Sequence, residues 1–222
     1  ESSRTKSGSI NQKELARYLG DEQSAVVMEA FWRDAKAGYE AALRGLLERG
    51  ALRHAIRIFM SARERVGLDM SIQRAVLRAL GMCGQVELAV SHVNELFSEG
   101  HVASSSVDLY NDIISGLCQS TSTDKPRLAE MIVKGMGEDG DTKPDSTTLA
   151  LLIETYTNAG APDFLTEVGH ALSKFTRQLR VEPTGSALLA VSAAHLRSGD
   201  VNAAYRWFIA SHQSASRPSF QD

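Results

Sequence analysis

Cysteine, proline and long apolar segments are all scarce in this sequence of 222 residues. Its two cysteines, Cys83 and Cys118, belong to no CxxC pair, which argues against a disulfide framework and favours buried thiols in a reducing interior. Only 5 prolines occur, and most lie between helical patterns. No segment approaches the roughly 18 apolar residues of a membrane-spanning helix, so we expect no membrane insertion.

Strong net charge and catalytic motifs are also missing. The 24 Lys and Arg residues against 27 Asp and Glu leave a net charge of −3, which counts against nucleic acid as the main partner. The six histidines show no metal-ligand spacing with one another or with the cysteines, and no nucleophile elbow or Walker loop occurs. The sequence therefore predicts a protein that is not an enzyme and that holds neither a metal nor a cofactor.

Apolar residues recur at three- and four-residue spacing almost throughout, which predicts an all-α fold. Glycine-containing breaks divide the chain into helices of roughly a dozen residues, as in helical hairpins. Tyr39–Phe59 and Leu188–Phe208 share one pattern: a helix, a turn glycine, and a second helix that ends in an aromatic residue. The turn glycines of four such units are Gly50, Gly84, Gly160 and Gly199. This pattern predicts a repeat of helix–turn–helix units.

Small residues lie at fixed distances from these turns. Five residues before the turn stand Gly45, Ala79, Thr155 and Ala194, with Gly116 at the matching place of the central unit. Five residues after it stand Ala55, Ala89 and Ala204, with Ala129 in the centre and Leu165 as the exception. We expect these side chains to let the two antiparallel helices of each hairpin approach closely.

The central unit carries a family resemblance. Val107–Cys118 (VDLYNDIISGLC) is similar to the first helix of a pentatricopeptide repeat (PPR), whose pattern reads V-x-x-YN-x-LI-x-GLC, and Lys143–Asp145 (KPD) resembles the end of that repeat. The resemblance implies an all-α solenoid, a right-handed superhelix of about five PPR-like repeats over residues 36–219. The expected boundaries are a flexible segment 1–10, a helical cap 11–35, and repeats 36–69, 70–104, 107–145, 146–184 and 185–219.

Two departures from the repeat are visible. The central unit carries an extra polar turn at Ser120–Lys125, and the second helix of the fourth unit is lengthened through Arg180. A row of stacked hairpins tolerates such insertions because they fall into surface turns.

The resemblance also implies candidate RNA-reading residues, since each PPR reads one base with a first-helix residue and its last residue. The first-helix residues are Glu40, Arg74, Asn111, Ala150 and Leu189, and the final residues are Asp69, Ser104, Asp145 and Thr184. Only Asn111 with Asp145 is similar to a familiar family pair, the uracil-selecting one. A local role is the alternative, in which Asn111 caps its own helix and Asp145 caps the next one.

Other family features of RNA binding are weak here. The positions that would sandwich a base hold Ala37, Ser71, Asp108, Thr147 and Ser186, and only Arg197 matches the phosphate-contacting position. A separate group of arginines comprises Arg44, Arg49, Arg53 and Arg57. These arginines fit either a solvated helix face or a contact with RNA phosphate or an acidic protein partner.

Two hypotheses follow. The preferred one is a non-enzymatic scaffold or interaction subunit of a large organellar assembly, with other protein subunits as its partners and structured RNA as a further candidate partner. The alternative is a single-stranded RNA-binding factor in organelle RNA processing or translation. The PPR resemblance implies a mitochondrial or plastid location, either soluble or peripheral.

Overall fold

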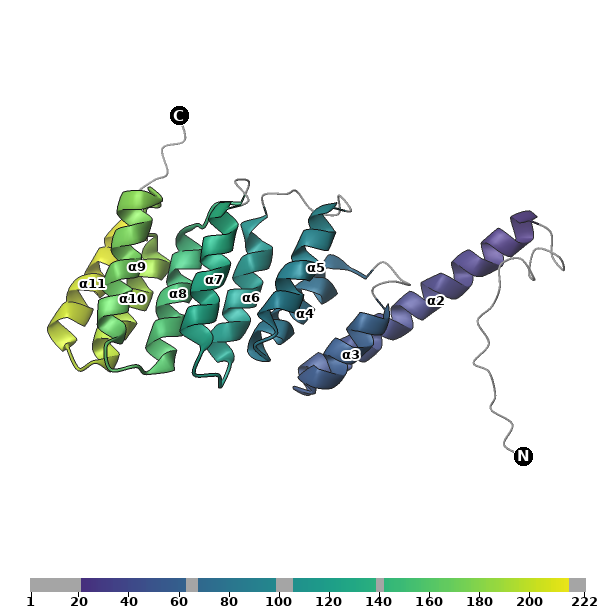
Figure 1. The fold of residues 1–222 in the computed structure, drawn as a ribbon, viewed down its shortest axis with the longest axis horizontal. Coiled ribbons are helices and arrows are strands. Elements are labelled where there is room, and N and C mark those ends of the chain that lie inside the picture. The colour runs from purple at the N-terminus through teal and green to yellow at the C-terminus, as the bar shows by residue number, and fades with distance from the viewer. Residues whose placement is uncertain (1–20, 63–67, 99–105, 139–141, 216–222) are drawn as a thin grey trace. The chain divides into compact units, whose positions relative to one another are not determined.

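The computed structural model describes residues 21–62, 68–98, 106–138 and 142–215. Within these ranges every regular element is a helix and no strand occurs (Figure 1), which confirms the predicted all-α class. The chain divides into two units, residues 1–72 and 73–222. The division lies inside helix α4 (Met70–Met82).

The first unit contains a long helix, α2 (Asp21–Glu48), and a shorter one, α3 (Leu52–Ala62), which pack on each other. Leu43, Ala55 and Phe59 are fully buried. Helix α2 runs without a break through residue 35, so the predicted boundary between a cap (11–35) and a first repeat (36–69) is not a helix end. The predicted segment 1–10 and the cap residues before Asp21 lie outside the described residues.

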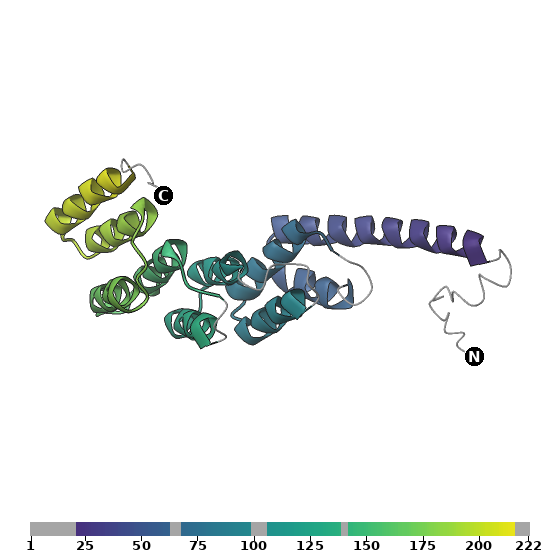
Figure 2. The ribbon, with the colours of Figure 1, turned by 90° about the horizontal axis from the view of Figure 1, so that it is seen from above.

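The second unit is a succession of helix pairs. Its pairs are α4 with α5 (Val86–Ser98), α6 (Val107–Gln119) with α7 (Lys125–Glu138), α8 (Ser146–Ala159) with α9 (Phe164–Ser173), and α10 (Gly185–Arg197) with α11 (Val201–Ala215). From α6 on, each first helix packs on the second helix of its own pair, and the first helices also pack on one another, from α6 to α8 and from α8 to α10. In Figure 2, α10 lies between α8 and α11.

The predicted turn glycines have the backbone conformation that a tight reversal needs. Gly50, Gly84, Gly160 and Gly199 have φ values of 68°, 70°, 69° and 86°, in the left-handed region that favours glycine. The central pair turns differently, as predicted. Ser120 Oγ accepts the N–H of Ser122 (3.1 Å), and the Lys125 Nζ donates to the Ser120 carbonyl (3.1 Å).

The lengthened second helix of the fourth predicted unit is present as well. Helix α9 continues into a π-helical turn, η1 (Lys174–Gln178), which buries Phe175 completely. The N–H of Val181 closes this turn on the Phe175 carbonyl (2.9 Å). Arg180 has a φ of 56°, so the helical path ends just before it.

Helices α4 and α6 approach each other closely through two glycines. A Cβ atom added at Gly81 would collide with the carbonyl oxygen of Ile113, and one at Gly116 would collide with that of Arg78. The need for a small residue at Gly116 is therefore confirmed, but its predicted contact is wrong. The nearest atoms belong to α4 of the preceding pair, not to the second helix of the same hairpin.

We predict that Gly116→Ala lowers the free energy of unfolding by about 1–3 kcal/mol, because the new methyl group must push two backbones apart. Gly135→Ala is the matched control, since Gly135 lies in α7 with open space around its Cα and a helical Gly→Ala change gains roughly 0.5–1 kcal/mol. Urea denaturation measures both. An unchanged midpoint for Gly116→Ala would contradict the close approach.

Helices α6 and α8 are joined at a buried thiol. The Sγ of Cys118 donates to the Leu151 carbonyl (3.2 Å) and lies 2.9 Å from Thr155 Oγ1. Burial raises the pKa of the Cys118 thiol from 9.0 to about 11. Cys118 is thus a buried structural thiol, as predicted, whereas Cys83 is only half-buried.

We predict that N-ethylmaleimide labels Cys83 before Cys118 in the native protein at pH 8, because the thiolate is the reacting form. The folded state holds the Cys118 proton more tightly than the unfolded state does. This contribution to stability is complete below pH about 9 and is lost as the pH rises towards 11. Mass spectrometry of labelled peptides checks the order, and equal labelling rates would show that the thiol is accessible.

Candidate nucleic-acid or partner interface

The reading positions of the first predicted repeat contact each other in the first unit. The backbone N–H of Asp69 donates to Glu40 Oε1 (2.9 Å), and Lys36 Nζ donates to Asp69 Oδ1 (2.8 Å). The hydrogen bond from Lys36 holds the pKa of Asp69 below its ordinary value. Both candidate residues therefore bind other residues of the chain.

The second reading position, Arg74, is part of an ion pair between α4 and α6. Arg74 Nε lies 2.5 Å from Asp112 Oδ2, and Arg78 Nε lies 2.7 Å from Asp112 Oδ1. Asp112 is only 4% exposed, so its charge is balanced by two arginines from the neighbouring helix. The hydrogen bond to Asp112 raises the pKa of Arg74. The repeat-final residue Ser104 lies outside the described residues.

Asn111 and Asp145, the pair with the strongest family resemblance, do come together. Asn111 Nδ2 donates to Asp145 Oδ1 (3.3 Å), and Asn111 Oδ1 lies 2.8 Å from the hydroxyl of Thr148. The same hydroxyl lies 2.9 Å from Asp145 Oδ1, and its single proton can serve only one of the two oxygens at a time. Asn111 is 6% exposed, so its amide joins α6 to the start of α8.

Of the two capping roles considered for this pair, one is confirmed and the other is wrong. Asp145 is the N-cap of α8, where it accepts the N–H of Thr148 (2.7 Å) in a capping box. Asn111 does not cap α6, because that helix begins at Val107 after Ser106. Asn111 lies instead in the second turn of α6, on a buried side.

The last two repeats contain no polar first-helix residue at the reading position. Ala150 is buried, whereas Leu189 is 45% exposed. The hydroxyl groups of the final residue Thr184 and of Ser146 share a hydrogen bond (2.9 Å), in which either can be the donor. Arg197 Nη1 donates to Asn158 Oδ1 (3.3 Å). Four of the five first-helix positions are thus buried or bound within the chain, and the fifth is apolar.

The arginine group of the first unit is arranged differently. Arg44, Arg49, Arg53 and Arg57 are all exposed. In the part of the chain that the structure describes, none forms a close ion pair with a carboxylate, although the charge of Arg44 adds to the effect of Lys36 in lowering the pKa of Asp69. Arg57 borders an apolar groove of about 570 Å³ between α2 and α3, lined also by Tyr39 and Ile58. The four arginines are therefore accessible to a phosphate backbone or to an acidic protein.

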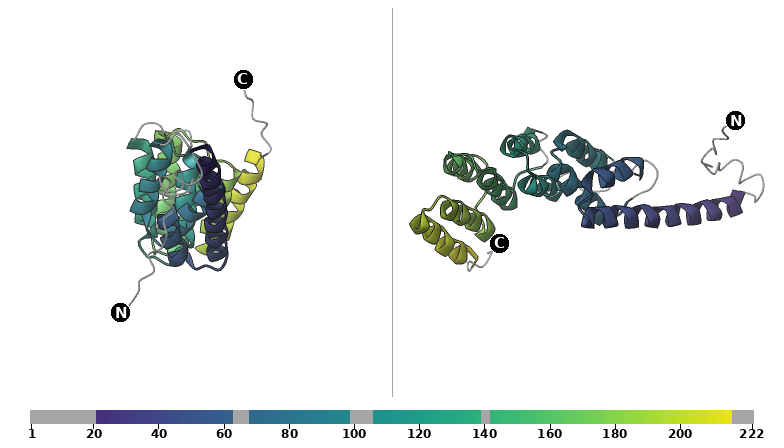
Figure 3. Two further views of the ribbon diagram at one scale, coloured as in Figure 1. Left: turned by 90° about the vertical axis from the view of Figure 1, so that its right-hand side faces the viewer. Right: turned by 90° about the horizontal axis from the view of Figure 1, so that it is seen from below.

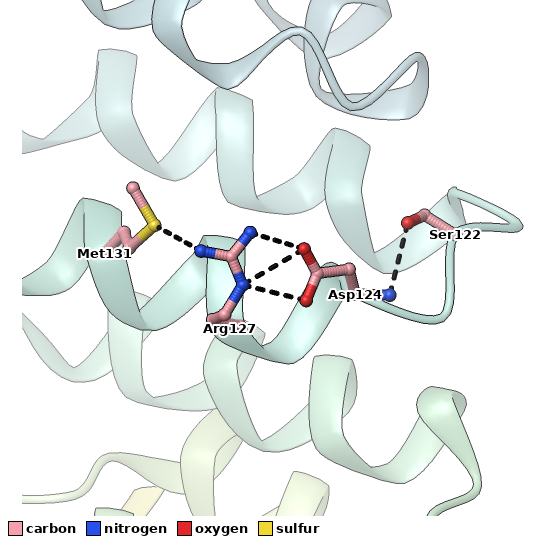
Figure 4. Close-up of polar contacts among 4 residues, drawn as sticks. All are labelled: Ser122, Asp124, Arg127 and Met131. Atoms are coloured by element: carbon pink, nitrogen blue, oxygen red, sulfur yellow. Dashed lines mark hydrogen bonds and ion pairs between the residues drawn. The ribbon is translucent and has the colours of Figure 1, made fainter.

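A second groove was not predicted from the sequence. It has a volume of about 560 Å³ and is lined by α7, α8, α9 and η1. On its α7 side Arg127 forms a bidentate pair with Asp124 and donates to the sulfur of Met131 (3.2 Å; Figure 4). On its α8 side the Tyr156 hydroxyl donates to Glu130 (2.6 Å), and burial together with this carboxylate raises the pKa of Tyr156. The i,i+3 and i,i+4 spacings of Asp124, Arg127 and Met131 are readable in the sequence, but the groove depends on how three helices pack.

Among the described residues, no three His, Cys, Asp or Glu side chains gather closely enough to hold a metal ion. None of the described helices has the length and apolar character of a membrane span. No protein-family model matches the chain, and no curated protein matches it.

We predict that Asp112→Asn lowers the free energy of unfolding by about 1–3 kcal/mol, because the amide N–H₂ group would face the guanidinium donors that the carboxylate now accepts. Asp124→Asn is the matched control, since it removes the same charge from an arginine pair that lies in solvent. Thermal denaturation of the two variants gives the comparison. Equal melting temperatures would show that Asp112 is not a structural link between α4 and α6.

Proposed function

We propose that the chain is a non-enzymatic, PPR-like scaffold subunit of a large organellar assembly. One observation carries the proposal: side chains at the predicted base-reading positions bind other residues of the same chain. Arg74 and Asn111 are engaged in contacts between consecutive helix pairs, and Glu40 holds the backbone of Asp69. A side chain whose polar groups bind a neighbouring hairpin cannot at the same time form hydrogen bonds with an RNA base. Binding of neighbouring protein subunits is therefore the function that this fold supports better.

The proposal includes the finer architecture. It is a right-handed solenoid of about five PPR-like repeats, in which each pair contacts its neighbours. The turn glycines and the packing of α6 on α8 and of α8 on α10 support the stacking of hairpins. The PPR resemblance of Val107–Cys118 supports the right-handed superhelix and a mitochondrial or plastid location. Structured RNA is a further ligand in this proposal.

The alternative is a single-stranded RNA-binding factor in organelle RNA processing or translation. One observation favours it: Arg44, Arg49, Arg53 and Arg57 are exposed and form no close ion pair with a carboxylate in the described residues. Such a group would contact phosphates without reading bases. It would therefore give affinity that depends on salt and not on sequence.

A binding assay with homopolymeric RNAs near physiological salt separates the two functions. We expect weak binding without base preference, which Arg49→Glu combined with Arg53→Glu abolishes for every RNA alike. Asn111→Ala should leave RNA binding unchanged while lowering stability, because the Asn111 amide serves α6 and α8. Tight, uracil-selective binding that disappears in Asn111→Ala would overturn the scaffold proposal. Isolation of the tagged chain in a stoichiometric complex from organelles is the complementary positive test.

A further inference from the structure

The last helix pair exposes an unusual amount of apolar surface. The side chains that the structure describes, which do not include those of residues 21–33, contain eight large apolar ones that are exposed, and six of these belong to α10 and α11. They are Leu189, Leu196, Val201, Tyr205, Phe208 and Ile209, and we call them the α10/α11 face. The pair lies at one end of the row of helices in the second unit, with α11 outermost (Figure 3, right).

The repeat register shows that two positions of the α10/α11 face, those of Leu196 and Phe208, are buried in preceding pairs. Leu196 corresponds to Gly81, Cys118 and Thr157, all of them buried, yet Leu196 is 60% exposed. Phe208 likewise corresponds to the buried residues Val93 and Val133 of α5 and α7. The last pair is built as an inner pair is, but no described helix of the second unit covers it.

The covering element in the earlier pairs is the first helix of the next pair. Cys118 of α6 touches Leu151 and Thr155 of α8. Glu130 of α7 corresponds to Tyr205, which is 65% exposed. Glu130 accepts a hydrogen bond from the hydroxyl group of Tyr156 in α8. The element that fits the α10/α11 face is therefore an amphipathic helix that lies alongside α10 and contacts α11.

The charged residues of α10 and α11 indicate the charge of the helix that would cover the face. In residues 185–215 the only acidic residue is Asp200, and it is occupied as a cap that accepts the N–H of Ala203 (2.9 Å). Arg197 and Arg206 have no carboxylate partner in the described residues. Because α10 and α11 carry these two arginines against the single capped Asp200, a second copy would bring like charge to like charge, which argues for a different protein with acidic residues beside its apolar stripe.

This chain contains an example of such a helix. Helix α6 carries Asp108 and Asp112 and no basic residue, and its Asp112 pairs with Arg74 and Arg78 of the pair that it covers. Because Ile113 and Leu117 of α6 are fully buried, a second copy cannot offer this helix. Its sequence is nevertheless a suitable probe.

We propose that the α10/α11 face binds an acidic amphipathic helix of a partner protein, which packs on Leu196, Tyr205 and Phe208 as the first helix of a further hairpin would. The proposal deepens the scaffold function and rests on it, since the partner is another protein subunit. It assigns the partner a chemistry: an apolar stripe bordered by carboxylates, which complement the net positive charge of α10 and α11.

The test uses the full chain and a fluorescein-labelled, hydrocarbon-stapled peptide with the sequence of Val107–Gln119 and Ser in place of Cys118. We expect saturable binding in fluorescence polarisation, weakened at least about tenfold by Leu196→Asp and by Tyr205→Asp. Thr166→Asp is the matched control, because Thr166 is the exposed α9 residue that corresponds to Tyr205, and it should bind as the original chain does. A peptide with lysine in place of both aspartates should bind more weakly.

Three results would overturn the proposal: no binding at peptide concentrations of about 1 mM, equal binding by Leu196→Asp and Tyr205→Asp, or equal binding by the lysine peptide. A concentration-dependent dimer in sedimentation that Tyr205→Asp abolishes would assign the face to a second copy and would also overturn it. Circular dichroism confirms that the variants remain folded, as expected for exposed positions. Uracil-selective RNA binding would instead overturn the scaffold function alone, so the two failures are distinguishable.

Discussion

The close contact between α4 and α6 is the constraint on which the second unit depends. Gly81 and Gly116 bring the two backbones together, and at this distance no side chain can separate them. Asp112 then lies within reach of Arg74 and Arg78, with its charge buried and balanced. A glycine contact alone would let the helices slide, whereas a buried acid between two arginines has one favourable register, so the ion pair supports specificity more than stability.

Helices α6 and α8 are also linked by buried polar side chains, but of different kinds. Between α6 and α8 the Asn111 amide, Asp145 and Thr148 form one polar cluster near the start of α8, and Cys118 with Thr155 forms another further along the helices. Of these side chains, Asn111 and Asp145 occupy positions at which the family resemblance implies contact with RNA bases. Satisfying a buried polar group within the chain avoids the cost of leaving it unpaired. Withdrawing the Asn111 amide to read a base would remove a link between two helix pairs.

Local features of the fold could be predicted from the sequence, and partners across helices could not. The all-α class, the turn glycines and the Asp145 cap follow from backbone chemistry within a few residues. The Asp112 ion pair joins residues 34 and 38 positions apart, which no short-range pattern specifies. Similarly, the small-residue pattern identified Gly116 but not the helix that it touches. The PPR resemblance sets the repeat boundary at residue 36 without any helix-ending signal in the sequence, so it does not predict that α2 continues through residue 35.

The α10/α11 face poses an energetic problem that limits the kind of partner it can have. In a row of stacked hairpins the apolar faces of each pair are covered by its neighbours, and an apolar face without a neighbour stays in contact with water. Complete burial of a large apolar side chain contributes about 1.5–3 kcal/mol, but these six are already partly covered, so each has less to gain. Association costs an estimated 4–15 kcal/mol in lost freedom, and an isolated helix of a dozen residues must also be ordered. A free peptide helix would therefore bind weakly, and a stable contact needs a partner whose helix is already held in a folded subunit.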